Sequence, residues 1–200
     1  MPIIDPASLH PRDAYRLLTS VVIPRPIGWV STIGSDGSRN LAPFSFFNGV
    51  GGQPPTIMVS IGQRQGQVKD SLRNIQETGE FVVNLVDESL AEAMNLSSGE
   101  YGYEVDEFAV AGLTPAPGQV VRAPRVAEAK IALEVKATQT VPVQDTHYTL
   151  VLGRVVRFHV QEGLLRPNGL VDAARLKPLA RLGGDEYAPL GPVFEMKRPA

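Results

Sequence analysis

The 200-residue sequence contains no cysteine, which excludes disulfide bridges, thiol catalysis and iron–sulfur clusters held by thiolates. Histidine is also scarce: His10, His147 and His159 are scattered, so no metal centre is expected. Long apolar runs are absent, so we expect no membrane-spanning helix. The N-terminal region has an early acid, Asp5, and no basic segment before an apolar stretch, so we expect no signal peptide and a cytoplasmic protein.

An excess of charge of one sign is lacking as well. The 19 Lys and Arg residues nearly balance 21 Asp and Glu residues, and the formal net charge is −2. The basic residues are dispersed, so neither nucleic acid nor a membrane surface is an expected partner. Glycine (19) and proline (17) are plentiful beside a hydrophobic content of 43%, which indicates many turns between short strands and not disorder.

The periodicity of the chain predicts many strands and few helices. Runs of β-branched and aromatic residues predict strands at 27–33, 40–49, 56–61, 81–86, 129–138 and 147–160. Helical spacing predicts short helices at 12–22, 70–78 and 87–94, with one further turn at 172–176. This pattern predicts a mainly β single domain over residues 1–200, a β-barrel core at about 20–160 with small peripheral helices, and a tail at 161–200.

Motifs for independent catalysis are missing. The glycines of 49–52 are followed by Pro54 and Pro55, so no helix N-terminus follows to receive a pyrophosphate. Residues 62–66 lack the Gly-Lys-Ser/Thr ending of a phosphate-binding loop. No serine stands in a nucleophile elbow. We therefore expect no catalytic side chain, and if the protein is an enzyme a cofactor carries the chemistry.

Three stretches, taken in order, carry a family resemblance. The first is 24–32 (PRPIGWVST) with 40–48 (NLAPFSFFN), the second is 69–75 (KDSLRNI) with 79–84 (GEFVVN), and the third is 179–187 (LARLGGDEY). Together they resemble the flavin reductase-like FMN-binding split-barrel family. The resemblance implies a six-stranded antiparallel Greek-key split barrel that forms a homodimer, with one FMN per subunit near the dimer interface.

The resemblance also implies an FMN-dependent oxidoreductase. NADH or NADPH would pass hydride through FMN to an acceptor, and the partners would be a small-molecule donor and acceptor or a partner redox protein. Two alternatives stay open: an electron-transfer flavoprotein in the manner of flavoredoxin, and a non-catalytic FMN-binding protein. No separate nicotinamide-binding fold is present, so we expect the donor to bind weakly across an exposed flavin ring.

The chemistry of FMN indicates which residues of these stretches would hold it. A phosphate requires hydroxyls, N–H groups and cations, and the start of a helix near Asp70 adds a favourable dipole. The candidates for the phosphate are Ser31, Thr32, Ser45, Arg64, Lys69 and Ser71, with Lys69 foremost. The candidates around the ring are Trp29, Asn40, Phe46, Phe47, Asn48 and Arg181.

Two alternatives remain within this candidate site. Strand alternation places residues 44, 46 and 48 on one face and 45 and 47 on the other, so either the strand bends there or backbone atoms share the binding. Trp29 fits core or dimer packing at least as well as stacking on the ring, and Phe44, Phe46 and Phe47 are residue types that usually pack in a core. Arg25 suits either a phosphate or a turn, and Arg181 and Tyr187 either border the pocket or pack.

Overall fold

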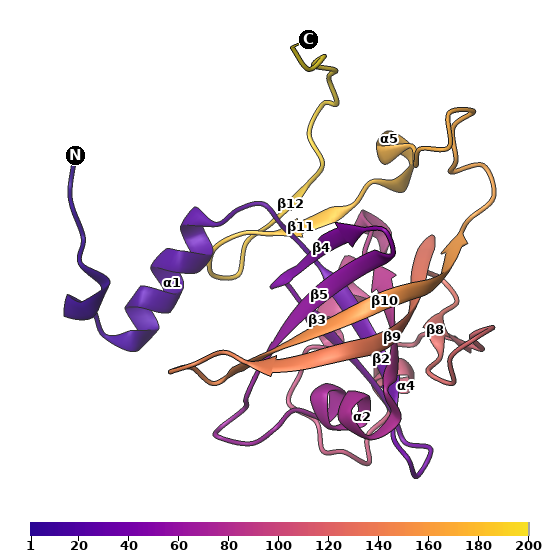
Figure 1. Ribbon diagram of the computed structural model, residues 1–200, viewed down its shortest axis with the longest axis horizontal. Helices are drawn as coiled ribbons and strands as arrows, with labels where there is room; N and C mark the ends of the chain where they lie inside the picture. The colour runs from indigo at the N-terminus through magenta and orange to yellow at the C-terminus, as the bar shows by residue number, and fades with distance from the viewer. Residues whose placement is uncertain (200) are drawn as a thin grey trace.

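The computed structural model describes residues 1–199 and is built around one antiparallel sheet of seven strands in the order β3-β2-β6-β9-β10-β5-β4 (Figure 1). Its strands are β2 (Gly28–Ile33), β3 (Arg39–Phe44), β4 (Phe47–Gly52), β5 (Pro55–Gly62), β6 (Glu80–Leu85), β9 (Ile131–Pro142) and β10 (Tyr148–Val160). The short strands β1 (Arg25–Pro26), β11 (Leu179–Arg181) and β12 (Tyr187–Pro189) form a second sheet, and β7 (Pro115–Ala116) pairs with β8 (Arg125–Val126).

The helices are short and peripheral. They are η1 (Pro6–Ser8), α1 (Pro11–Val21), α2 (Asp70–Thr78), η2 (Glu88–Leu90), α3 (Ala91–Leu96), α4 (Glu107–Val110) and α5 (Ala173–Leu176). Helix α2 begins with an acid in its first turn and ends at Gly79, whose φ of 71° is the left-handed conformation that glycine adopts at low cost. The predicted mainly β fold with small helices is confirmed.

The edges of the large sheet explain why the barrel is split. The edge strands β3 and β4 are consecutive in the chain and are separated by a bend at Ser45 and Phe46. Within residues 1–199 no ladder pairs β3 with β4, so the sheet curls without closing. The strand expected over 40–49 therefore bends, which is the first of the two alternatives given for this stretch (a bend, or binding shared by backbone atoms). Because this bend yields two strands, the sheet has seven strands and not six.

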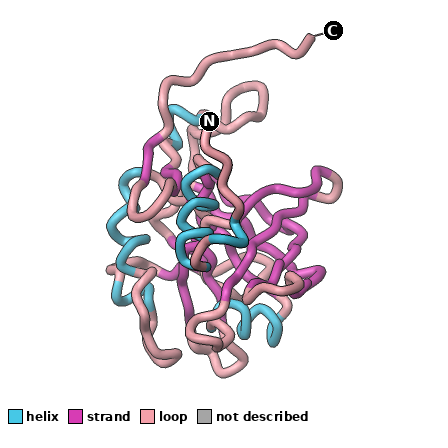
Figure 2. The backbone as a smooth tube through the Cα atoms, turned by 90° about the vertical axis from the view of Figure 1, so that its left-hand side faces the viewer, coloured by secondary structure: helices cyan, strands magenta, loops and turns pink. Residues whose placement is uncertain are grey.

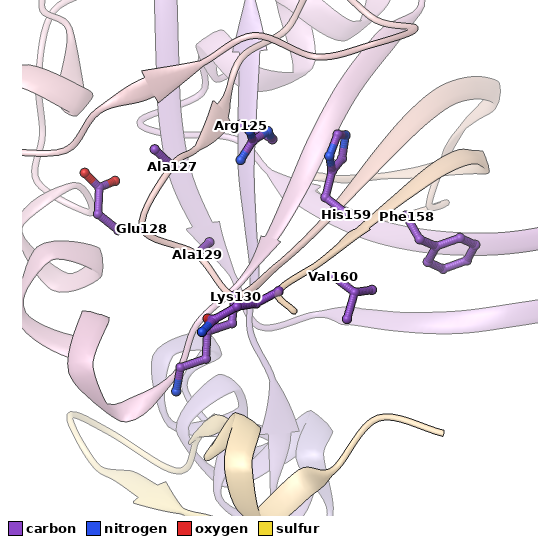
Figure 3. A pocket seen from close by; sticks show the side chains of 9 residues that line it. Arg125, Ala127, Glu128, Ala129, Lys130, Phe158, His159 and Val160 are labelled. Carbon is purple, nitrogen blue, oxygen red and sulfur yellow. The ribbon is translucent and has the colours of Figure 1, made fainter. Parts of the chain in front are cut away.

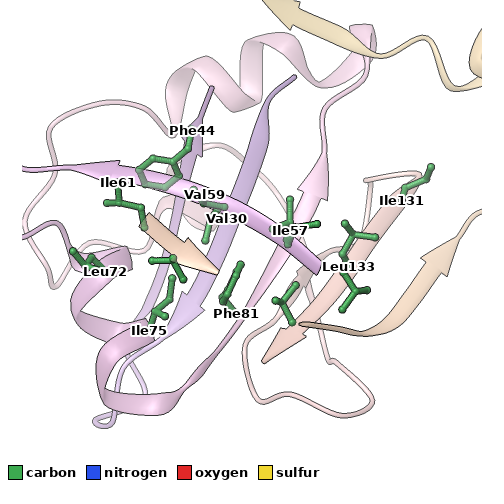
Figure 4. Packing of buried hydrophobic residues seen from close by; sticks show 14 of the residues in the cluster. Val30, Phe44, Ile57, Val59, Ile61, Leu72, Ile75, Phe81, Ile131 and Leu133 are labelled. Carbon is green, nitrogen blue, oxygen red and sulfur yellow. The ribbon is translucent and has the colours of Figure 1, made fainter. Parts of the chain in front are cut away.

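The main core fills the inside of the curled sheet (Figure 4). Phe81, Val59 and Val30 are fully buried there, and each contributes about 1.5–3 kcal/mol through burial. Helix α2 covers one end of this core with Leu72 and Ile75. A second cluster, around Trp29, Leu41 and Phe108, packs on the opposite face of β2 and β3. The core thus holds α2 and β3 firmly, and both elements border the candidate site.

Helix α1 and the C-terminal residues lie outside this core. Figure 1 shows α1 standing off the sheet, and Figure 2 shows the C-terminal residues running away from the body. Thr19 is the one buried residue of α1. Apolar side chains on the helix stay exposed, among them Leu18 (49%) and Val21 (65%). The space between α1 and the sheet is where the cleft described next opens.

Candidate functional site

Three hollows meet at Pro43 and Lys69. The largest, the α1 cleft, has a volume of about 800 Å³ between helix α1, the bend after β3 and the tail around β11 and β12. The α2 hollow, about 50 Å³, lies at the first turn of helix α2. The Tyr148 hollow, about 170 Å³, lies between the bend and the start of β10. Pro43 and Lys69 line all three, so these hollows form one continuous candidate site.

The α2 hollow has the features of an anion site. Lys69 is the residue before α2, and the N–H groups of Asp70 and Ser71 precede the first helical hydrogen bonds, which run from Leu72 and Arg73 to the Lys69 carbonyl. Helix N-termini of this kind attract phosphates because the unbonded N–H groups and the helix dipole both favour negative charge. Small-molecule sites measure roughly 300–1,000 Å³, so a hollow of about 50 Å³ receives a small group and not a ring.

Lys69 is the cation best placed to use that hollow. It is half-buried, its ammonium lies 5.4 Å from the centre of the Phe44 ring, and it makes no salt bridge within residues 1–199. Burial, and then the charge of Arg64, lower the pKa of Lys69 below its usual value. Both effects disfavour the free ammonium, and a bound anion would offset both. Arg64 lines the same hollow and donates to the Tyr101 carbonyl (3.3 Å).

Aromatic rings line the Tyr148 hollow beside the bend. Phe46 lies between Tyr15 of α1 and Tyr148 of β10, with ring centres 6.5 Å and 5.7 Å away, respectively. Ser45 lines both this hollow and the α1 cleft. Flat apolar walls beside a few polar groups are typical of pockets that bind aromatic ligands.

Arg25 holds the walls of the α1 cleft together. Its guanidinium donates to the carbonyls of Thr19 and Val22 at the end of α1, to the Leu182 carbonyl in the tail (2.7 Å) and to the Ser45 hydroxyl (3.3 Å). Arg25 is only 5% exposed, and burial lowers its pKa. Of the two roles open for it, the structure favours the structural one.

Arg181 and Tyr187 border the α1 cleft and bind each other. The guanidinium of Arg181 donates to the Tyr187 hydroxyl and lies 4.4 Å from the centre of its ring. It also donates to the Gly184 carbonyl and lies 3.6 Å from the carboxylate of Asp185. Both residues therefore line the candidate site and also pack against each other.

Three predicted contact residues do not line the site with their side chains. Trp29, Ser31 and Thr32 are fully buried. The indole of Trp29 donates to Ser97 (2.9 Å) inside the second core cluster, so neither face of the ring is open for stacking. The Ser31 hydroxyl donates to the Pro124 carbonyl, and Thr32 accepts from Asn74. Their side chains brace β2, so, contrary to the expectation for these side chains, only the backbone of the three residues remains for a contact with the cofactor.

Asn40 and Ser71 lie at the α2 hollow but are engaged with protein groups. The Ser71 hydroxyl donates to the Asn40 side-chain oxygen (2.7 Å), and the Asn40 amide donates to Glu107 (2.8 Å). Glu107 also accepts from the N–H of Leu41 (3.0 Å), and burial raises its pKa. This network fixes the back of the hollow, so the two side chains shape it while the Ser71 N–H stays available.

Phe47 and Asn48 lie outside the three hollows. Phe47 packs against the main core and an apolar groove on the other side of the bend. Asn48 is exposed on β4 and accepts from the N–H of Gly49 (2.8 Å). The bend at Ser45 and Phe46 redirects the chain there, so the predicted ring contacts of these two side chains are not formed within the single chain.

Helix α1 supplies site residues that were not predicted. Arg12, Tyr15, Arg16 and Thr19 all line the α1 cleft. They occupy positions i, i+3, i+4 and i+7, which share one face of a helix. That spacing is visible in the sequence, but it did not indicate that this face turns toward the flavin motifs.

A second cleft, of about 490 Å³, lies near the far end of β10 (Figure 3). Arg125 and His159 line it, and His159 contacts the fully buried Glu134 at 2.6 Å. Among the residues that line this cleft none begins a helix, so it lacks the helix dipole that the α2 hollow has. Within residues 1–199 no cluster of side chains suits a metal ion. In the same residues, no helix is long and apolar enough to span a membrane.

Comparison with known proteins gives one consistent result. The model of the flavin reductase-like domain matches residues 20–179. An uncharacterized protein of Aquifex aeolicus is 44% identical over 174 residues, or 86% of this chain and 88% of the relative. The structure of nitrilotriacetate monooxygenase component B from Bacillus cereus superposes with a TM-score of 0.94 at 40% identity over 98% of each chain. That of the Pseudomonas fluorescens 2-nitrobenzoate 2-nitroreductase NbaA gives 0.90 at 31% identity, over 99% of this chain and 96% of the other. These matches confirm the resemblance carried by the sequence motifs, and the chain belongs to the flavin reductase-like domain family.

Proposed function

We propose that the protein is an FMN-dependent oxidoreductase that uses NADH or NADPH to reduce an acceptor. The observation that carries this proposal is Lys69, a half-buried cation without a salt bridge in the described chain, at the first turn of α2 and at the junction of three hollows. A phosphate there would meet an ammonium, free backbone N–H groups and a favourable helix dipole.

The dimensions of the site fit FMN. The α2 hollow, about 50 Å³, has room for a small group such as the terminal phosphate of FMN. The α1 cleft, about 800 Å³, lies within the roughly 300–1,000 Å³ range of small-molecule sites. We therefore propose FMN, with Lys69 and Arg64 at the phosphate and with Ser45 and Phe46 beside the ring.

The protein would position its reactants without acid–base chemistry of its own. Bound FMN supplies hydride transfer and exchange of single electrons. Phe46, Tyr15 and Tyr148 would exclude water from one side of the ring, and Ser45 would offer a hydroxyl to its polar edge. The α1 cleft is open to solvent, so a nicotinamide and an acceptor would enter it in turn and bind weakly.

Two related proteins support an oxidoreductase role. One is named as a nitrilotriacetate monooxygenase component and the other as a nitroreductase. We propose for this chain the redox chemistry that both names share, and not the particular substrates that they mention.

Rapid mixing tests the proposal. Purified protein loaded with FMN is mixed with NADH or NADPH in a stopped-flow instrument without oxygen. We expect the visible absorption band of the flavin to bleach with at least one donor. Failure of both donors to bleach a bound flavin would refute the reductase and leave an electron carrier reduced by a partner protein, as in flavoredoxin. Protein that binds neither FMN nor FAD would refute the flavin site.

We also propose that the protein is a homodimer that works in the cytoplasm, where reduced nicotinamide cofactors are available. The exposed apolar face of α1, with Leu17, Leu18 and Val21, supports a partner copy that covers it. Light scattering is expected to give twice the chain mass of 21.6 kDa. A mass of one chain at micromolar concentration would refute the dimer.

A further inference from the structure

The α1 cleft is strongly cationic although the protein as a whole is slightly acidic. Its lining includes the five cations Arg12, Arg16, Arg25, Lys69 and Arg181 and a single carboxylate, that of Asp185. The formal net charge of the chain is −2. Such a local excess attracts anions to the cleft.

Three of these cations already have a role. Arg25 is bound to three carbonyls and to Ser45. Arg181 is bound to Tyr187 and Gly184 and lies 3.6 Å from Asp185. Lys69 also lines the α2 hollow, where the phosphate of FMN is proposed to bind. Any further anion in the cleft therefore depends on the remaining two arginines.

Arg12 and Arg16 are those two arginines. They are exposed, and within residues 1–199 neither guanidinium makes a hydrogen bond or a salt bridge. They are four residues apart on α1, so both project from the face that turns toward the cleft. The bonds from Arg25 to the carbonyls of Thr19 and Val22 fix the end of this helix against the rest of the site. The two guanidiniums therefore stand at the cleft as donors that no other described residue engages.

We propose that Arg12 and Arg16 form an anion subsite for the substrate that exchanges electrons with the flavin. The inference rests on the proposed function. A guanidinium binds phosphate and carboxylate groups through paired N–H donors, and two of them would hold either a phosphate of the nicotinamide donor or an acidic group of the acceptor. The subsite compensates for the missing nicotinamide-binding fold, because it anchors the charged end of a substrate whose reactive ring must lie over the flavin.

The test is steady-state kinetics of the FMN-loaded protein. The double variant Arg12→Gln/Arg16→Gln is compared with Arg154→Gln/Arg157→Gln, which removes two exposed arginines of β10 that line none of the three hollows. The donors are NADH, NADPH and 1-benzyl-1,4-dihydronicotinamide, which carries no phosphate. The acceptors are 1,4-naphthoquinone and its 2-sulfonate, which differ by one negative charge.

We expect the α1 variant to raise KM for an anionic substrate about tenfold at low salt, with a smaller effect at high salt, while kcat changes little. An increase with NADH and NADPH but not with the benzyl donor identifies the donor phosphates as the anion. An increase with the sulfonate but not with the neutral quinone identifies the acceptor. Either result supports the subsite, and the control variant keeps wild-type KM values.

Two results would overturn the subsite while leaving the proposed function intact. One is an unchanged KM for every substrate in a variant that still binds FMN and is still reduced. The other is a weakened affinity for FMN with unchanged KM values, which would place the two arginines at the phosphate of the flavin. Wild-type protein that cannot bind FMN would instead refute the proposed function itself.

Discussion

Replacing Lys69 by alanine is the most direct test of where the flavin phosphate binds. The ammonium is half-buried beside Phe44, and its pKa is lowered by burial and by Arg64. A bound anion would offset the cost of holding this positive charge in the free site. A charge-assisted hydrogen bond in such a place contributes about 1.5–3 kcal/mol. Arg64 and the N–H groups of α2 remain in the variant, so we do not expect binding to be abolished. The dissociation constant of FMN should rise roughly 10- to 150-fold.

Riboflavin makes this experiment specific. It has the ring and ribityl chain of FMN without the phosphate, so its affinity should be the same for wild type and Lys69→Ala. Fluorescence titration of both flavins against both proteins gives the coupling between the ammonium and the phosphate directly. Lys136→Ala, on an exposed position of β9, controls for the loss of one positive charge. FMN affinity that is unchanged in Lys69→Ala, or a loss that riboflavin shares equally, would refute the assignment of this hollow to the phosphate.

The pH dependence of FMN binding provides a second readout of the same contact. Because the pKa of Lys69 lies below the usual value for lysine, the free site loses its charge at a lower pH than an exposed lysine would. Affinity for FMN should therefore fall as pH rises through that pKa, and riboflavin affinity should not. In Lys69→Ala this alkaline loss should disappear. Identical alkaline profiles for the wild type and the variant would contradict the reasoning.

Two further predictions concern the framework. Glu134→Gln should destabilise the protein by about 1–3 kcal/mol, because Glu134 accepts from the N–H groups of Gln119, Val120 and Val121. Burial raises the pKa of Glu134, but these donors and His159 outweigh burial and lower that pKa to about 2. The stabilisation from Glu134 should therefore be complete above the ordinary glutamate pKa and be lost as pH falls toward 2. Urea unfolding at a series of pH values that gives the same acid slope for wild type and Glu134→Gln would refute this role of Glu134. Leu18→Glu, on the exposed apolar face of α1, should give a monomer in light scattering while Val110→Glu on α4 leaves a dimer; a Leu18→Glu dimer would show that another surface holds the two copies.

Local signals predicted the elements well because their causes lie within a few residues. Helix α2 has its predicted bounds, Asp70–Thr78, since an acid at its start and Gly79 at its end are sufficient to define it. Strand β10 begins one residue from its predicted start, because a run of β-branched and aromatic residues is itself the signal. Helix α4 was missed because it has only four residues, in a segment rich in glycine.

The side chains of the site were predicted less well, because contacts between distant residues decide their roles. Ser31 has the hydroxyl that a phosphate requires, but this hydroxyl donates to the carbonyl of Pro124, 93 residues away. Asn40 has the amide that a flavin edge requires, but Glu107, 67 residues away, accepts from it. A motif shows which donors are available and not which of them the fold has already used. Lys69 stays a prediction, and it rests on two signals, since its helix position and its charge both indicate an anion.

The arrangement of the site separates the groups proposed for the flavin from those proposed for its substrate. Lys69 immediately precedes α2, which covers the main core, and Ser45 and Phe46 form the bend between β3 and β4, so elements of the barrel position all three. Arg12, Arg16 and Arg181 belong to α1 and the tail, which lie outside that core and are joined to the bend by the guanidinium of Arg25. The exposed residues Arg12 and Arg16 of α1 can therefore change with little cost to folding or to flavin binding. The barrel would thus determine which cofactor is bound, and the two peripheral segments that Arg25 holds in place would determine which donor and acceptor are bound.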